Sequence, residues 1–169
     1  MKTLLFIHLF SCNFLVFAQL SDNSADTAFD FWIGEWEGTW DEGDGQVGKA
    51  TNSITKTMDG KVIEENFVIY QGQSKGFVGK SLSVYQPQLY IWKQAWVDSQ
   101  NGYYDFSGQF DLDKRIFITD KKMLKDKVVL QRMVFYNIEE NSFTWDWEMS
   151  EDGGKNWNLS WRINYIRRK

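Results

Sequence analysis

Carboxylates are the strongest acid–base candidates in this sequence. The one histidine, His8, and the one cysteine, Cys12, both lie in an apolar run at the N-terminus. Histidine is the usual general base and a common metal ligand near neutral pH. If this run is removed, the chain has no histidine and no cysteine. It then cannot form a Ser-His-Asp triad, a thiol nucleophile, an ordinary zinc site or a haem site with a His or Cys ligand. The residues therefore favour a binding protein over an enzyme, and they predict no cofactor and no metal site.

Two pairs of carboxylates are close in the sequence. Asp146 and Glu148 alternate along one segment, and Glu64 is adjacent to Glu65. A retaining glycosidase needs two carboxyl groups about 5 Å apart in a cleft. Asp146 and Glu148 lie opposite an aromatic face, so we expect them in solvent and assign no catalytic residue. The acidic segment 41–45 (DEGDG) could hold calcium, but it lacks the spacing of an EF-hand.

The segment from Ser150 to Trp157, SEDGGKNW, fits the pattern Ser-x-Asp-x-Gly-x-x-Trp. This pattern resembles the Asp box of sialidases and related glycan-processing propellers. Hairpin geometry accounts for it as well, because Asp152 can accept turn amides and Gly153 and Gly154 tolerate positive φ. A sialidase would also need several boxes, an arginine cluster and a nucleophilic tyrosine. We therefore expect Asp152, Gly154 and Trp157 to be structural.

The elements that hold these residues are expected to be strands. Near the C-terminus, apolar and polar residues alternate with period two, which is typical of strands with one buried face. One such face is Phe143, Trp145, Trp147 and Met149; another is Trp157, Leu159, Trp161, Ile163 and Tyr165.

Turn signals divide the chain into ten expected strands, including the two near the C-terminus. Asp-Gly and Asn-Gly pairs suit tight hairpin turns, and Pro87 falls in one of the turns. A short helix is expected before the first strand, with Asp26 as its cap and Gly34 after it. Closing a ten-stranded meander removes its exposed edges, so the sequence predicts an all-β, up-and-down antiparallel barrel. The turns are expected at 41–45, 59–60, 72–76, 86–88, 101–102, 111–113, 124–127, 139–141 and 152–154.

Aromatic and polar side chains share one face of the fifth expected strand. Trp92, Gln94, Trp96 and Asp98 alternate there, as in ligand cavities whose flat apolar walls carry a few polar groups. The alternative is a barrel filled with the aliphatic residues of the other face, with the tryptophans outside. A slightly wide barrel has room for one ligand.

Three further side chains join this set of expected ligand-binding residues. Trp145 and Trp147 belong to the aromatic face described above. Arg132 lies on a strongly apolar strand. Inside the barrel it would need a carboxylate such as Asp98, or an acidic group on the ligand. Outside the barrel it would be solvated, and the sequence leaves both interpretations open.

Two motifs near the N-terminus carry a family resemblance. Gly34-Glu35-Trp36 resembles the Gly-x-Trp signature of lipocalins and other calycin barrels. That resemblance implies that Gly34 and Trp36 are structural and that Trp36 closes one barrel end below a short 3-10 helix. The segments 29–36 (FDFWIGEW), 96–99 (WVDS) and 150–157 together resemble a family of uncharacterised, often secreted bacterial proteins, described only as a domain of unknown function. The family implies a calycin-like barrel without an activity. Nitrobindin-type barrels bind haem through a histidine, which this region lacks.

The first residues are typical of a secretory signal. Lys2 precedes the apolar run, and cleavage is expected after Ala18. The expected organisation is a signal peptide at 1–18, a lead-in at 19–27 and one barrel domain at 28–169. Without Lys2, the chain has 18 basic and 23 acidic residues and no basic stripe for nucleic acid. We expect a secreted or periplasmic protein without a transmembrane segment; the alternative is a lipoprotein anchored through Cys12.

The sequence thus predicts a barrel that binds a small apolar or aromatic ligand. One alternative is a carbohydrate-handling module, either binding or hydrolytic, that uses exposed tryptophans as stacking platforms. Another is a ligand-free interaction protein of the cell envelope. The ligand and the oligomeric state do not follow from the sequence.

Overall fold

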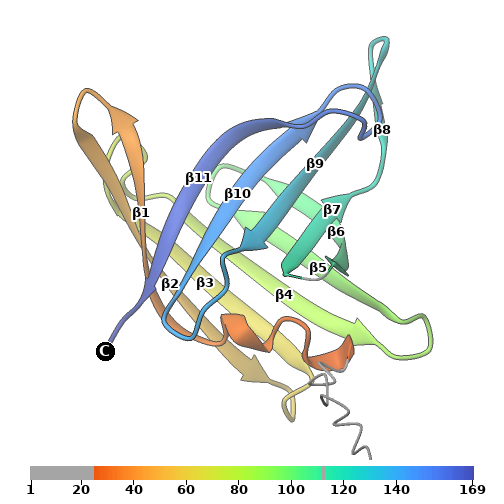
Figure 1. Ribbon diagram of the computed structural model, residues 1–169, viewed down its shortest axis with the longest axis horizontal. Helices are drawn as coiled ribbons and strands as arrows, with labels where there is room; N and C mark the ends of the chain where they lie inside the picture. The colour runs from red at the N-terminus through yellow and green to blue at the C-terminus, as the bar shows by residue number, and fades with distance from the viewer. Residues whose placement is uncertain (1–24, 112) are drawn as a thin grey trace, which may run out of the picture.

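The computed structural model describes residues 25–111 and 113–169, which form one β-barrel (Figure 1). The expected signal peptide, the alternative lipid anchor Cys12 and most of the lead-in lie outside the described residues. Two 3-10 turns, η1 (Ala25–Thr27) and η2 (Asp30–Trp32), precede the strands. The strands are β1 (Gly34–Gly43), β2 (Gln46–Thr57), β3 (Val62–Gln71), β4 (Val78–Gln86), β5 (Ile91–Asp98), β6 (Tyr103–Asp111), β7 (Lys114–Thr119), β8 (Lys122–Leu124), β9 (Lys127–Tyr136), β10 (Ser142–Ser150) and β11 (Asn158–Arg167).

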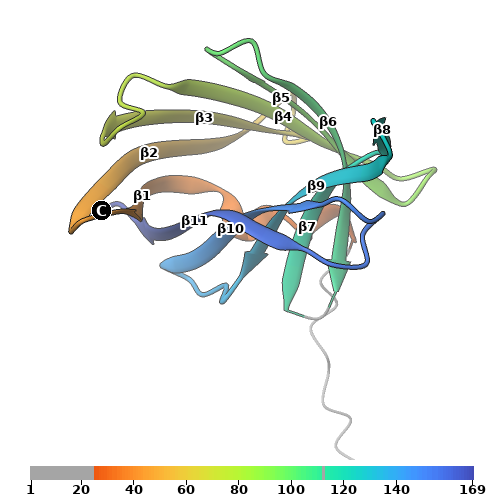
Figure 2. The same cartoon turned by 90° about the horizontal axis from the view of Figure 1, so that it is seen from above.

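Ten of these strands close the barrel, and all pair antiparallel with their neighbours. The order runs from β1 to β7, continues through β9 and β10 to β11, and closes where β11 pairs with β1. Seen from above, β3, β4 and β5 lie on one side of the interior and β7, β10 and β11 on the other (Figure 2). The predicted fold class, an up-and-down barrel of about ten strands, is confirmed.

The seventh expected strand is split. β7 pairs Ile118 with Arg132 of β9, whereas β8 pairs Lys122 with Val129 of the same strand. One extra residue at this break shifts the register between the two short strands. The β8–β9 hairpin then projects beyond the barrel at the top of Figure 1, and all three residues of β8 are exposed.

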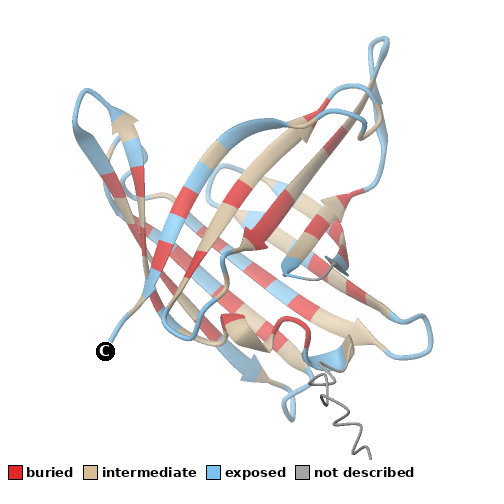
Figure 3. Ribbon diagram, viewed as in Figure 1, coloured by how far each residue is buried: buried red, intermediate tan, exposed pale blue. Residues whose placement is uncertain are grey.

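Alternation of apolar and polar residues decides which side chains face inward. Buried residues recur at every second position along most strands (Figure 3). In β3, for example, Ile63, Glu65, Phe67 and Ile69 are buried, while their neighbours are more exposed. The core is mostly aromatic, so its packing depends on the orientation of large flat rings.

Glycines inside the strands make room for some of these rings. A Cβ added to Gly79 of β4 would lie 2.1 Å from the Trp96 ring of β5, and one added to Gly48 of β2 would lie 2.0 Å from the Trp40 ring of β1. The indoles therefore lie flat across the neighbouring strand. Glycine inside a strand usually weakens the strand, and this close approach explains why glycine occurs at these two positions.

A bulge in β11 changes the face of two predicted interior residues. Trp161 is opposite Trp147, but Leu159 is opposite Glu148, so Ser160 has no partner of its own. One unpaired residue reverses the alternation beyond it. Leu159 is therefore exposed, and Trp157 lies outside the barrel instead of sharing the face of Trp161.

The 3-10 turns cover one end of the barrel, called here the closed end. The single helix expected with Asp26 as its cap is instead two three-residue turns, and η2 begins after Phe29 without a side-chain cap. Trp36 is fully buried below η2, and its Nε1 donates to the carbonyl of Trp32 at 2.8 Å. Arg167 of β11 covers the other side of the Trp36 ring at 4.1 Å. These contacts give Trp36 the position that the Gly-x-Trp resemblance implies.

Candidate functional site

The barrel interior contains a cavity of about 140 Å³. Its wall is made by residues from η2 and most of the strands, and eleven of the fifteen lining side chains are aromatic. The lining residues nearest η2 are buried, whereas the rings towards the opposite end of the barrel are half-buried. The lining residues are Trp32, Asn52, Glu65, Phe67, Phe77, Trp96, Tyr104, Phe106, Met133, Phe135, Trp145, Trp147, Trp161, Ile163 and Tyr165.

One carboxyl group, that of Glu65, lies in this aromatic wall. Its side chain is 5 % exposed. Asn52 Nδ2 donates to Glu65 Oε1 at 2.8 Å, and Ser81 Oγ donates to Oε2 at 2.6 Å. Gln94 Nε2 lies 3.3 Å from the Ser81 hydroxyl and 2.9 Å from that of Ser83. A short polar network therefore runs across β2, β3, β4 and β5 inside an otherwise apolar core.

Burial dominates the electrostatics of this network. Because desolvation disfavours the charged form, the pKa of Glu65 is raised to about 7, although its hydrogen bonds from Ser81 and Asn52 oppose the rise. Burial also raises the pKa of Tyr165 well above its usual value, and the nearby Glu65 carboxyl adds to this effect. Near neutral pH the carboxyl can thus change its protonation state while the Tyr165 phenol stays neutral.

Some polar atoms at the cavity have unused hydrogen-bonding capacity. Within the described chain, neither the Nε1 of Trp32 nor the Oδ1 of Asn52 has a hydrogen-bond partner, although both atoms are buried. Both residues line the cavity. Buried polar atoms are normally paired, so these two are candidates for contact with a bound molecule or water.

The cavity continues towards the end of the barrel opposite η1 and η2, called here the open end. A wider surface pocket there shares Phe77 and Trp161 with the cavity and is bordered by Trp40, Glu42 and Gln73. The pairing of β1 with β11 ends at Thr39 and Asn164, so the two strands separate towards this end. Phe77 and Trp161 therefore lie where the cavity meets this surface pocket.

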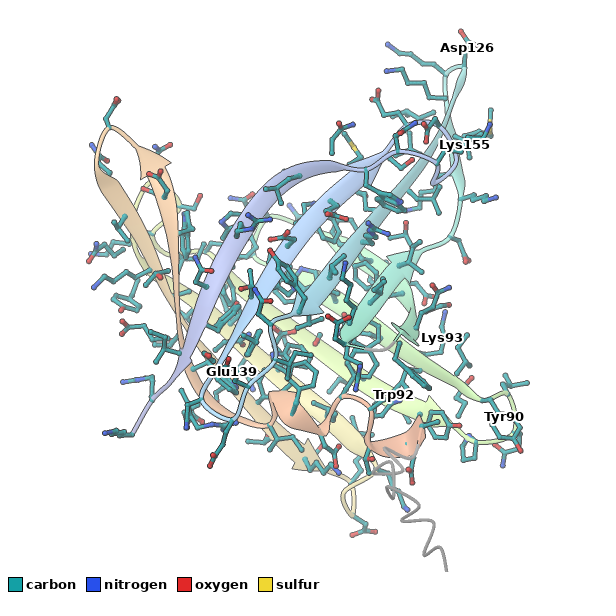
Figure 4. The ribbon with its side chains drawn as sticks, in the orientation of Figure 1. Tyr90, Trp92, Lys93, Asp126, Glu139 and Lys155 are labelled. Carbon is teal, nitrogen blue, oxygen red and sulfur yellow. The ribbon has the colours of Figure 1, made fainter. Side chains whose placement is uncertain are left out.

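The structure brings together part of the predicted ligand-binding set. Trp96, Trp145 and Trp147 line the cavity. Trp92 faces inward but lies near the closed end, where its Nε1 donates to the Ala25 carbonyl at 2.7 Å (Figure 4). Gln94 is fully buried and belongs to the polar network without lining the cavity.

Asp98 does not belong to the cavity wall. Its carboxylate accepts hydrogen bonds from Trp96 Nε1 at 3.1 Å and from the amides of Gln100 and Gly102 at 2.9 Å. These bonds lower its pKa against the opposing effect of burial. The side chain therefore orders the β5–β6 turn and orients one cavity ring.

Arg132 faces outward, so its interior interpretation is wrong. Its Nε donates to Glu148 Oε2 at 2.6 Å, and its guanidinium lies 3.9 Å from the centre of the Trp157 ring. The pairing with Asp98 that an interior Arg132 would allow is not formed, because β9 and β10 place Arg132 and Glu148 opposite each other on the outer face. Arg132 has no access to a ligand inside the barrel.

The carboxylate pair on β10 is structural in its contacts. The Asp146 carboxylate accepts two hydrogen bonds from Arg162, each 2.7 Å long, and one from the Tyr136 hydroxyl at 3.2 Å. We expected Asp146 in solvent, but this cluster leaves it 4 % exposed. Because Asp146 and Glu148 are each held by an arginine on the outer face, they do not form a glycosidase pair in a cleft.

The Asp box residues are engaged within their own hairpin. Asp152 Oδ1 accepts hydrogen bonds from the amides of Lys155 and Asn156 at 3.0 Å, and its Oδ2 accepts one from Asn156 Nδ2 at 2.7 Å. Trp157 Nε1 donates to the Gly154 carbonyl at 3.1 Å. Figure 4 shows Lys155 at the open end, far from Trp92. The carboxylate is used by the turn and does not point into the cavity.

The carboxylates of the acidic turn between β1 and β2 also accept hydrogen bonds from neighbouring groups. Asp41 Oδ1 accepts the Gly43 amide at 2.8 Å, and Glu42 accepts the Gln73 amide and Trp40 Nε1. In the described parts of the chain, no three His, Cys, Asp or Glu side chains gather as a metal site would require.

Among the cavity residues that the sequence interpretation did not select, Glu65 and Asn52 carry the carboxyl and the amide group of the wall. A usable signal existed for Glu65, because it shares a period-two face with Ile63, Phe67 and Ile69. A carboxylate at such a position needs an explanation. Asn52 has the same signal, lying between Ala50 and Ile54 on the buried face of β2.

No protein-family model matches the chain, and no curated protein matches it. Among residues 25–111 and 113–169, no helix is long and apolar enough to span a membrane.

Proposed function

We propose that this protein binds a small apolar or aromatic ligand inside its barrel. The observation that carries this proposal is the cavity of about 140 Å³ with eleven aromatic side chains in its wall. An engineered protein cavity of about 150 Å³ binds benzene, so a ligand with one ring fits this volume. Phe77 and Trp161 mark the route from the open end.

Tryptophan fluorescence offers a direct test, because Trp96, Trp145 and Trp147 line the cavity. A library of small aromatic compounds and lipids should contain members that quench the emission with saturation. Trp147→Leu should weaken that binding, whereas Trp157→Leu on the outer face is the matched control and should leave the affinity unchanged. Absence of saturable quenching by any member of the library would overturn the proposal.

The carbohydrate-handling alternative receives little support from the tryptophans. All nine lie within the described residues, and each is buried or half-buried. The outer Trp157 is covered on one face by Arg132. A stacking platform for a sugar needs an exposed ring face, so the interior cavity is the better supported site. The ligand-free envelope protein would leave the cavity without a role.

The proposal includes secretion, on the basis of the sequence alone. Cleavage after Ala18 would give a mature protein that begins at Gln19, and anchoring through Cys12 would give an acylated N-terminus instead. Mass spectrometry of the N-terminal peptide from the native host separates the two. The resemblance to the uncharacterised bacterial family likewise stays a prediction, and it adds no activity.

A further inference from the structure

The Glu65 carboxyl has unfilled acceptor positions in the cavity wall. Its two oxygens each accept one hydrogen bond, from Asn52 and Ser81. A carboxylate has about four acceptor sites, so about two remain free. Since Glu65 lines the cavity and is 5 % exposed, these positions face the cavity and are largely shielded from bulk solvent. A donor group on a bound molecule would fill them.

The carboxyl also lacks a positive partner among the described residues. No ion pair among the described residues involves Glu65, and no lysine or arginine lines the cavity. The other titratable side chains in the wall are Tyr104 and Tyr165. A buried carboxylate without a counter-charge is costly, and burial accordingly raises the pKa of Glu65 to about 7. A cation bound in the cavity would supply the missing charge.

The rest of the wall also suits a cation. The indole and phenyl rings that surround the cavity present negative π faces and positive edges, and indole binds cations best. Anionic ligands, such as fatty acids, would meet the Glu65 carboxyl without any arginine or lysine to bind their own charge. Glu65 and the rings together therefore favour a ligand with a positive charge.

We infer that the cavity takes a small organic amine, with its ammonium group at Glu65 and an apolar, preferably aromatic, body among the tryptophans. This inference rests on the proposed function and names its ligand class. The volume of about 140 Å³ limits the enclosed part to one ring with a short amine arm. The buried position of Glu65 places the ammonium at the inner part of the cavity, so the amine enters first.

Three probes of similar size and different charge test the inference. Benzylamine, benzyl alcohol and benzoate are titrated into the purified protein at pH 8, with calorimetry and tryptophan fluorescence as readouts. Benzylamine should bind at least about tenfold more tightly than benzyl alcohol, as expected for a partly desolvated cation contact, and benzoate should bind weakest. Between pH 8 and pH 5.5 the benzylamine affinity should fall as Glu65 takes up a proton, while that of benzyl alcohol stays constant.

Two variants connect this preference to one side chain. Glu65→Gln should lose the preference for benzylamine and keep the binding of benzyl alcohol. Glu64→Gln is the matched control, since Glu64 lies on the outer face and pairs with Lys80 at 2.9 Å. It should keep the preference of the wild type.

The outcomes separate the two proposals. If benzyl alcohol binds as tightly as benzylamine, or if Glu65→Gln keeps the preference, the amine inference is wrong and the proposed function stands. If none of the probes binds, and the wider library also fails, both are wrong. The comparison of probes on the wild-type protein decides the question even where a variant does not fold.

Discussion

The guanidinium of Arg132 lies 3.9 Å from the centre of the Trp157 ring, on the outer surface of the barrel. The same side chain pairs with Glu148 through Nε at 2.6 Å. Trp157 reaches this position because the bulge at Ser160 moves the start of β11 to the opposite face. The cation–π contact therefore holds the Asp box hairpin against β9, and the ion pair joins β9 to β10.

Replacing Arg132 with alanine should lower the free energy of unfolding by about 1–2 kcal/mol, because a partly exposed ion pair and a cation–π contact contribute up to about 1 kcal/mol each. Urea unfolding followed by circular dichroism measures this change. Lys127→Ala is the control, since the Lys127–Glu151 pair is exposed and should contribute almost nothing. Probe affinity should not change in Arg132→Ala; a loss of affinity at unchanged stability would mean that the arginine serves the ligand.

Arg167 should stabilise the closed end of the barrel. It donates to the carbonyls of Ile33 and Glu140, each at 2.9 Å, and covers the Trp36 ring. A lysine has one ammonium group and cannot keep this forked geometry. Arg167→Lys should therefore reduce the free energy of unfolding by about 2 kcal/mol. Arg168→Lys, at an exposed neighbouring position, should have little effect, and equal losses in the two variants would contradict this assignment.

The fold was predictable because its main determinant is local. In a strand, successive side chains point to opposite faces, so the alternation of apolar and polar residues reports the inner face directly. Turn residues then mark where the strands end, with glycine in several of the turns, as at Asp59-Gly60 and Asn101-Gly102. A meander with these features has few alternatives to closure, because open edges invite further pairing.

The details of the site depend on pairing between strands, which the sequence does not state. A single unpaired residue, Ser160, reverses the faces of Trp157 and Leu159. Arg132 faces outward because Glu148 is opposite it on β10. The alternation pattern alone indicates that Glu65 is buried, but the identity of its partners depends on which strands lie beside β3.

The position of the Trp96 ring should depend on the absence of a side chain at Gly79. A Cβ at this position would lie 2.1 Å from the Trp96 ring, so the ring would have to move. Gly79→Ala should therefore reduce the free energy of unfolding by about 1–3 kcal/mol, as overpacking does, and should also change the probe affinity. In Gly108→Ala the new Cβ meets Trp92, which does not line the cavity. That control should lose stability and keep its affinity, whereas unchanged affinity in Gly79→Ala would exclude Trp96 from the binding surface.

Glu65 should make the unfolding free energy depend on pH between about 4.5 and 7. Its pKa is about 7 in the folded protein and 4.5 at its ordinary value, so in this range the folded state binds more protons than the unfolded state. Stability contributed by Glu65 is then complete below pH 4.5 and is lost as the pH rises through about 7. With about 1.4 kcal/mol for each pH unit, the total loss is about 3 kcal/mol.

Denaturant unfolding at a series of pH values from 5 to 8 measures this loss, and the difference from Glu65→Gln isolates it. The glutamine variant carries no titrating group at this position, so its unfolding free energy should fall less over the range. The burial-raised pKa of Tyr165 keeps that phenol neutral throughout, and Asp152, whose pKa is lowered by its turn hydrogen bonds, acts only at more acidic pH. Glu64→Gln should keep the wild-type slope, because Glu64 is on the outer face and its hydrogen bond with Lys80 lowers its pKa. A bound amine should flatten the wild-type slope by holding the carboxylate in its charged form. Parallel pH profiles for the wild type and Glu65→Gln would show that Glu65 does not titrate in this range.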